Sequence, residues 1–360
     1  MGPFPHSAKP QPISPDNPAG TNGFAFVEFA HESPEVLRAL FKQMGFVPVA
    51  RHRHQAIELW QQGEIRYLIN CQAGSHGMNF VKNHGPSAPS MGWFVVDPQQ
   101  AFEHAVSKGA KPVLDAASKS IDAPAIYGIG GSLLYFVQVG ADFSHDFEFG
   151  DEVKPKGVGF YYLDHLTHNV YKGNMQRWFE FYGELFNFKE IRFFDIQGKH
   201  SGLYSRALTS PCGKIRIPIN EDRGEKGQIV AYLEKYRGEG IQHIAVGTED
   251  IYGATDAIYQ NGIRFMPPPP AAYYALSHAR VAGHQEPLDS LAKHGILIDG
   301  EGVVDGGETK ILLQIFSKTL VGPIFFEFIQ RKGDDGFGEG NFQALFESIE
   351  AQQLADGELA

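Results

Sequence analysis

The feature that most constrains the fold of this chain is a repeated alternation of short strands and amphipathic helices. Residues 23–30 (GFAFVEFA) have the composition of a strand, and Ser33 and Pro34 then supply an N-cap and a first helical residue. Apolar residues follow at helical spacing up to Gly45, and two short strands are expected after the helix. The same order begins again near residues 91, 163 and 241, so the chain contains four strand–helix–strand units of roughly 50 to 70 residues.

The four units form two similar halves. Residues 131–138 (GSLLYFVQ) match residues 322–330 (GPIFFEFIQ), which indicates an ancient duplication within an α+β protein. The polar, proline-rich residues 1–22 are expected to form a flexible N-terminal tail. Residues 23–150 and 158–360 are then the two predicted domains, separated by a linker.

Charge and cysteine content exclude several classes of function. The 31 Lys and Arg residues against 42 Asp and Glu residues give a net charge of −11, so nucleic acid is not an expected partner. No apolar stretch approaches the ~20 residues that span a bilayer, and the N-terminus does not resemble a signal peptide. The two cysteines, Cys71 and Cys212, lie in separate halves and form no metal-type pair. We therefore expect a soluble, cytoplasmic protein without a membrane partner.

Three strands of the second half each carry one side chain that can bind a metal: His165, His243 and Glu327. The first half has no imidazole in the corresponding strands, and Phe136 is expected where Glu327 would fall. Glu327 is the most informative, because it lies in the apolar run IFFEFI, where a buried carboxylate needs a metal or a cation as partner. The alternatives for Glu327 are a position at the sheet edge or a pair with an arginine.

The choice of histidine follows from the alternation of side chains along a strand. His165 and His168 are three residues apart, which places them on opposite faces of a strand, so only one can point into a shared site. We choose His165. Two imidazoles and one carboxylate without thiolate form the ligand set of a non-haem Fe(II) oxygenase. Zinc or nickel in a glyoxalase-like isomerase uses similar groups, so the residue types leave the metal open.

Four segments carry a resemblance to a known family. Residues 164–170 (DHLTHNV), 240–245 (GIQHIA), 325–331 (FFEFIQR) and 336–342 (GFGEGNF) closely resemble, in the same order, the motifs of the 4-hydroxyphenylpyruvate dioxygenase family. The resemblance covers nearly the whole chain. It implies the vicinal-oxygen-chelate fold, with four βαβββ modules paired into two open-barrel domains, the first metal-free and the second catalytic.

The resemblance also implies an activity and a set of site residues. The activity is the Fe(II)-dependent conversion of 4-hydroxyphenylpyruvate and O2 to homogentisate and CO2, a reaction of tyrosine and phenylalanine catabolism. Fe(II) would be bound by His165, His243 and Glu327. The residues that match the family's aromatic substrate pocket are Ser205, Pro218, Asn220, Gln228, Gln242, Gln314, Phe325, Phe337, Asn341 and Phe342.

The C-terminal segment resembles the helix that closes over the site in this family. From the residues alone, 341–350 is an amphipathic helix with one apolar face formed by Phe342, Leu345, Phe346 and Ile349. Such a segment suits a mobile lid, and a helix that is simply docked is the alternative.

Other readings of the same architecture stay open at this point. A 4-hydroxymandelate synthase would use the same substrate and metal but hydroxylate the benzylic carbon. Pro218 and Asn220 resemble the ring-hydroxylating type. A glyoxalase-like metal-dependent isomerase would not consume O2, and a ligand-sequestering member would lack a complete set of metal ligands. The resemblance further implies a homo-oligomer, a dimer or a tetramer, without selecting between them.

Overall fold

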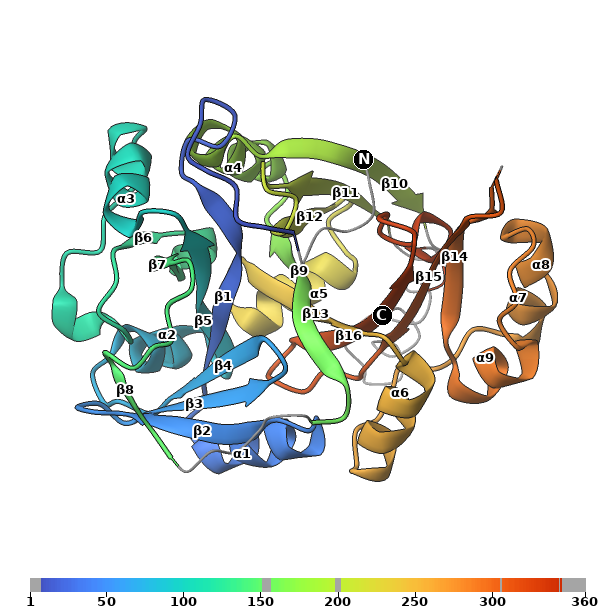
Figure 1. Cartoon of the computed structure of the whole chain (residues 1–360), viewed down its shortest axis with the longest axis horizontal. Helices are drawn as coiled ribbons and strands as arrows, with labels where there is room; N and C mark the ends of the chain where they lie inside the picture. The colour runs from blue at the N-terminus through green and yellow to red at the C-terminus, as the bar shows by residue number, and fades with distance from the viewer. Residues whose placement is uncertain (1–7, 151–156, 198–201, 305, 343, 345–360) are drawn as a thin grey trace.

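The structure is a computed structural model that describes residues 8–150, 157–197, 202–304, 306–342 and 344 (Figure 1). The predicted C-terminal lid helix lies almost wholly outside these residues. Of its apolar face only Phe342 is described, whereas Leu345, Phe346 and Ile349 are not.

The first half forms one eight-stranded sheet. The strands and helices in chain order are β1 (Thr21–Ala30), α1 (Pro34–Gln43), β2 (Val47–His52), β3 (Ile57–Gln62), β4 (Ile65–Asn70), α2 (His76–His84), β5 (Ser87–Val95), α3 (Pro98–Ser107), β6 (Ala125–Tyr127), β7 (Leu133–Gln138) and β8 (Phe147–Phe149). Their order in the sheet is β6-β7-β5-β1-β4-β3-β2-β8.

The second half forms a second eight-stranded sheet. Its elements are β9 (Phe160–Val170), α4 (Met175–Phe186), β10 (Lys189–Gln197), β11 (Gly202–Thr209), β12 (Arg216–Asp222), α5 (Gln228–Tyr236), β13 (Gly240–Thr248), α6 (Ile251–Gln260), α7 (Ala271–Ala275), α8 (Ser277–Arg280), α9 (Leu288–His294), β14 (Leu297–Val303), β15 (Thr309–Phe316) and β16 (Phe325–Lys332). The sheet order is β10-β11-β12-β9-β13-β16-β15-β14.

Each sheet is built from two βαβββ modules that meet at an antiparallel pair, β1–β5 in the first and β9–β13 in the second. The predicted fold class, with four such modules in two open barrels, is therefore confirmed. The sequence pattern predicts fewer elements than the structure contains, because it does not show β2, α2, β6, β8, β10, α5, α7–α9 or β14. β2 contains Pro48, which weakens its signal as a strand. α2 (HGMNFVKNH) does have local signals, the N-cap Ser75 and the buried Phe80 and Val81, which the sequence reading missed.

Local sequence sets the start of two helices at the expected residues, although the side chain of Ser33, at the N-cap of α1, makes no capping hydrogen bond. α3 begins after Asp97, whose side chain accepts a hydrogen bond of 3.0 Å from the backbone N–H of Gln100, and Pro98 is its first residue. β1 begins at Thr21, two residues before the predicted boundary of the first domain. Asn17 just before it is buried and accepts a hydrogen bond from the Thr21 backbone. No helix in the described part of the chain is long and apolar enough to cross a membrane.

One apolar core joins the two halves. Phe29 of β1 and Phe326 of β16 stack with ring centroids 6.1 Å apart, and Trp93 of β5 stacks on Phe188 at 5.3 Å. Because side chains alternate along a strand, Phe326 faces this shared core while Glu327 faces the interior of the second barrel. Packing of the halves and orientation of the site are thus set by the same strand.

A glycine marks one of the closest approaches between the halves. Gly130 has φ +58°, and a Cβ built on it would lie 1.9 Å from the carbonyl oxygen of Glu239 in the second half. Its neighbour Gly131 also has a positive φ, +83°, but no atom lies within 4 Å of its Cβ position. Both glycines therefore have a backbone conformation that disfavours other residues, but only at Gly130 would a side chain also collide with the second half.

We expect Gly130→Ala to lower the free energy of unfolding by about 2 kcal/mol or more beyond the loss caused by Gly131→Ala. Both substitutions place a side chain in a left-handed conformation, but only the first forces the halves apart. Urea denaturation of the two variants measures the difference. Equal losses would show that the contact between Gly130 and Glu239 relaxes without cost.

Candidate metal centre

Three neighbouring strands bring His165, His243 and Glu327 together. In the register of the sheet, Ala245 of β13 is paired with His165 of β9 on one side and with Glu327 of β16 on the other. His243 lies two residues before Ala245 and therefore on the same face of β13. Strand pairing thus brings together three residues that are far apart in the sequence.

The three side chains converge on one point. His165 Nε2 lies 3.3 Å from His243 Nε2 and 3.1 Å from Glu327 Oε2, and His243 Nε2 lies 3.4 Å from the same oxygen. All three residues are buried, with 2%, 6% and 2% exposure for His165, His243 and Glu327. They form a group of ligand-type atoms within 4.8 Å of one another, in an arrangement that suits a metal ion.

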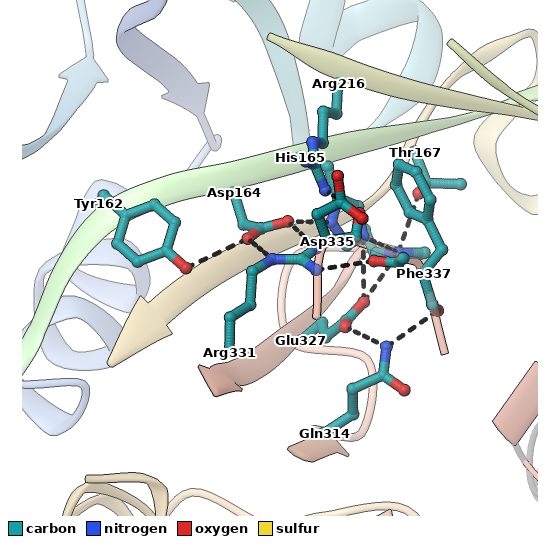
Figure 2. Close-up of polar contacts among 12 residues, drawn as sticks. Tyr162, Asp164, His165, Thr167, Arg216, Gln314, Glu327, Arg331, Asp335 and Phe337 are labelled. Carbon is teal, nitrogen blue, oxygen red and sulfur yellow. Dashed lines mark hydrogen bonds and ion pairs between the residues drawn. The ribbon is translucent and has the colours of Figure 1, made fainter. Parts of the chain in front are cut away.

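Each imidazole is held by its other nitrogen. His165 Nδ1 lies 2.8 Å from Asp164 Oδ1 (Figure 2). His243 Nδ1 lies 3.0 Å from Gln242 Oε1. An oxygen acceptor at Nδ1 fixes the proton there and leaves Nε2 for a metal. Thr167 is a further neighbour, with its hydroxyl 2.9 Å from His243 Nε2.

The charges of the metal-free protein follow from these contacts. Burial would raise the pKa of Glu327, but His165 and His243 outweigh it and lower that pKa to about 2. Burial would lower the pKa of His165, but Glu327 and Asp164 outweigh it and raise that pKa to about 8. At His243 burial prevails, and the pKa is lowered. At neutral pH without metal, an ionised Glu327 is therefore paired with a protonated His165.

His168 faces away from this group, as the alternation of side chains predicts. Its Nε2 lies 2.8 Å from the hydroxyl of Tyr182 on α4, and burial lowers its pKa to about 3. It is therefore a neutral, hydrogen-bonded histidine on the other face of β9.

A row of amide side chains continues from the metal-binding group. Gln314 Nε2 donates to Glu327 Oε1 at 2.9 Å, and Asn341 Nδ2 donates to Gln314 Oε1 at 3.0 Å. On the other side of the group, Asn220 Nδ2 donates to Gln242 Oε1 at 3.2 Å. These amides, all predicted from the family resemblance, are buried and linked to the candidate metal ligands.

The predicted aromatic residues lie at different distances from the centre. Phe325 stacks on His243 with centroids 4.8 Å apart, and Phe337 contacts His165 edge-on at 5.3 Å. Phe342 instead stacks on Phe194 of β10 at 4.4 Å. Two of the three rings thus border His165 and His243 directly.

The remaining predicted pocket residues lie on β11, β12 and the start of α5. Ser205 is paired with Asn220 across β11 and β12, which places the two at the same level of the sheet. Pro218 lies on the same strand as Asn220, two residues earlier, and Gln228 is the first residue of α5. All of them are buried. Their role in substrate binding stays a prediction.

Sequence reasoning missed the partners that hold the candidate metal ligands and the amides beside them. Asp164, Arg331 and Tyr273 were not singled out, although Asp164 is adjacent to His165 and Arg331 follows Glu327 by four residues. Arg331 donates to both oxygens of Asp164, at 2.7 and 2.9 Å. Tyr273 donates to Asn341 Oδ1 at 2.5 Å. An acidic residue beside a metal-binding histidine was a usable signal for Asp164.

The first half has other side chains at the equivalent positions. Phe26 and Tyr135 are both paired with Gly92 of β5, as His165 and Glu327 are both paired with Ala245. The prediction that Phe136 replaces Glu327 is therefore wrong, and the residue is Tyr135. Residues 131–138 and 322–330 differ in length by one residue. Aligned at their first glycine, they place Phe136 opposite Glu327; aligned at Gln138 and Gln330, they place Tyr135 there. The rings of Phe26 and Tyr135 lie 5.6 Å apart and fill this space.

Comparisons with known proteins agree with this fold. Residues 162–282 match the family model of the glyoxalase/bleomycin resistance protein/dioxygenase superfamily, which defines the class of protein. Residues 15–149 match the model described as hydroxyphenylpyruvate dioxygenase, N-terminal. A 4-hydroxyphenylpyruvate dioxygenase of Legionella pneumophila (strain Corby) is 48% identical over 96% of this chain and 98% of its own length. One of Pseudomonas aeruginosa is 49% identical, also over 96% and 98%.

This chain belongs to the 4-hydroxyphenylpyruvate dioxygenase family, and its resemblance to that family is confirmed. Two solved structures have similar folds. A fusion of a xylose isomerase-like barrel with a 4-hydroxyphenylpyruvate dioxygenase gives a TM-score of 0.79 at 29% identity, covering 93% of this chain and 52% of the fusion. A mutant of 4-hydroxymandelate synthase from Streptomyces coelicolor gives 0.79 at 23% identity over 92% and 99%, which bears on the fold alone.

Metal binding at this site would depend on pH. A metal ion must displace the proton of His165, whose pKa of about 8 places that proton on the ring at neutral pH. We expect cobalt(II) to release close to one proton at pH 7 and about a tenth of a proton at pH 9, so apparent affinity rises with pH until about pH 8. Calorimetry in buffers of different ionisation enthalpy counts the protons.

His168→Gln is the matched control, because it removes a buried histidine of the same strand that faces away from the site. It should leave the proton count unchanged at both pH values. An equal count at pH 7 and pH 9 in the unmodified protein would contradict the assigned protonation of His165.

Proposed function

We propose that this chain uses Fe(II) to convert 4-hydroxyphenylpyruvate and O2 to homogentisate and CO2. The observation that carries the proposal is the convergence of His165, His243 and Glu327 inside a barrel lined by amides and phenyl rings. The relatives in Legionella pneumophila and Pseudomonas aeruginosa that bear the name 4-hydroxyphenylpyruvate dioxygenase support the same substrate.

The donor set fits iron(II). Two imidazole nitrogens and one carboxylate oxygen without thiolate favour a non-haem iron centre that keeps other positions open for ligands. When bound, iron(II) would supply the Lewis acidity that holds a 2-oxo acid and the redox chemistry that uses O2. Asp164 and Gln242 hold the imidazoles so that both Nε2 atoms point to the same place.

Protein side chains orient the aromatic ring of the substrate. Phe325 and Phe337 lie against the metal-binding histidines and supply apolar faces for a flat ring. The amides of Asn220, Gln242 and Gln314 offer donors and acceptors for a phenol hydroxyl, and Ser205 lies level with Asn220. We assign Pro218, Gln228, Asn341 and Phe342 to the same pocket, whose task is to hold the ring beside the metal.

Exclusion of water is the second task of the protein. The metal-binding side chains are almost fully buried, and Phe337 over His165 is only 3% exposed. In the reaction, one oxygen atom of O2 enters the new carboxylate as CO2 leaves, the other enters the ring, and the side chain moves to the adjacent ring carbon. A dry, apolar wall protects the reacting species from side reactions with water.

The test is the reaction of the purified chain with Fe(II), ascorbate and 4-hydroxyphenylpyruvate, with O2 uptake and product followed together. We expect one homogentisate per O2 consumed. His165→Ala should lower turnover by more than ~100-fold, because loss of an outer partner of a metal ligand already costs 10–100-fold. His168→Gln should retain turnover, since that side chain faces α4.

Each other outcome has a defined meaning. Formation of 4-hydroxymandelate would keep the metal and the substrate but overturn the assignment of ring hydroxylation. No O2 uptake by iron-loaded protein would overturn the dioxygenase reaction and favour a metal-dependent isomerase. A dimeric or tetrameric assembly remains a separate prediction, which light scattering of the purified protein tests.

A further inference from the structure

A carboxylate behind the metal-binding group connects two parts of the site. Asp164 is 0% exposed, and its Oδ1 accepts from His165 Nδ1 at 2.8 Å and from Arg331 Nη2 at 2.9 Å. Its Oδ2 accepts from Arg331 Nε at 2.7 Å and from the hydroxyl of Tyr162 at 3.2 Å (Figure 2). His165 and Arg331 therefore share one buried acceptor.

Arg331 extends from Asp164 to a loop on its other side. Its Nη1 donates to the backbone carbonyl of Asp334 at 3.1 Å and to that of Gly336 at 2.7 Å. A planar guanidinium can bridge a carboxylate and two carbonyls at once, which a lysine ammonium cannot do in the same geometry. Asp164 and the loop are thus held by opposite sides of one side chain.

The loop, residues 334–337, is held throughout by side chains of the barrel. Arg331 binds the first and third of its carbonyls, and Arg216 Nη1 donates to the carbonyl of Asp335 at 2.6 Å. Gln314 Nε2 donates to the carbonyl of Phe337 at 3.1 Å and also to Glu327 Oε1. Each successive carbonyl of the loop is therefore bound by a side chain, and two of those side chains also contact a metal-binding residue or its support.

The loop in turn places Phe337 over the site, with its ring 5.3 Å from that of His165. Movement of the loop would break the bonds from Arg331 and release one side of the support for Asp164. Rotation of the His165 ring would remove one of the hydrogen bonds that hold Asp164 against Arg331. The orientation of the His165 ring and the position of the loop therefore depend on the same hydrogen bonds between Asp164 and Arg331.

We propose that Asp164 and Arg331 are positioning residues that couple the metal-binding orientation of His165 to the docked position of residues 334–337. The inference rests on the metal site proposed above. Because such coupling is reciprocal, bound metal should tighten the loop, and the docked loop should strengthen metal binding.

The test uses cobalt(II) as probe on the full-length protein. Affinity is measured by competition with a chelator, and the visible absorption of the bound cobalt reports ligand geometry. Hydrogen exchange of peptides covering residues 333–342 is compared with and without cobalt. In the unmodified protein, cobalt should slow exchange in these peptides.

Asp164→Asn should weaken cobalt binding by ~10-fold or more and change the visible spectrum, as loss of an outer partner of a histidine ligand does. It should also remove most of the effect of cobalt on exchange in residues 333–342. Arg331→Lys keeps a buried positive charge for Asp164 but cannot hold both carbonyls. It should therefore lose less affinity than Asp164→Asn while losing the effect on exchange.

Lys332→Gln is the matched control, because it removes an ion pair with Glu286 from the next position of β16. It should change neither the affinity nor the effect on exchange. The proposal is overturned if cobalt binds without slowing exchange in the unmodified protein, or if either Asp164→Asn or Arg331→Lys retains the full effect. Absence of cobalt binding in the unmodified protein would instead overturn the metal site itself. If Asp164→Asn fails to fold, Arg331→Lys decides.

Discussion

The second half of the molecule is organised around a carboxylate that the sheet keeps from water. Glu327 lies between Phe326 and Phe328 on a strand whose other face forms the core shared by both halves, so its position cannot change without disturbing that core. Burial alone would keep this group protonated. Two imidazoles and the amide of Gln314 stabilise the charge, and they come from neighbouring strands because register brings them there. His165, His243 and Gln314 contact this carboxylate directly, and Gln314 in turn connects it to Asn341 and to the loop that carries Phe337.

Much of this arrangement is predictable from sequence, for identifiable reasons. The strand–helix repeat is a periodic signal, and an acidic residue in an apolar strand stands out because its burial requires a partner. The two-residue period of a strand predicts that His165 and His168 lie on opposite faces, so that only one of them can point into the site, but it does not select which. β2, β6, β8, α7–α9 and β14 were missed because they are short, whereas α2, β10 and α5 were missed although each has nine residues.

Other parts of the site could not be read from local pattern. Arg331 contacts Asp164 across 167 positions of sequence, and Tyr273 contacts Asn341 across 68. Only the paired strands and the loops between them bring such residues together. The pocket residues were reached through family resemblance, and the register of β11, β12 and β9 explains why Ser205, Asn220 and Asn169 share one level. The error of one residue at Tyr135 has the same origin, because side-chain direction depends on register and a shift of one position reverses the face.

The short strand β8 gives the first sheet a property with consequences for synthesis. Although it follows β7 in the chain, it crosses to the far edge of the sheet and pairs with β2, where Ala50 is opposite Phe149 (Figure 1). On the ribosome, the first sheet therefore reaches its final strand order only when residues 147–149 have emerged. In the second half, by contrast, the four strands of each module (β9–β12 and β13–β16) lie together on one side of the sheet. The last strand of the first half to be synthesised thus pairs with β2, a strand from near its start. This pairing becomes possible just before the second half, which contains His165, His243 and Glu327, is synthesised.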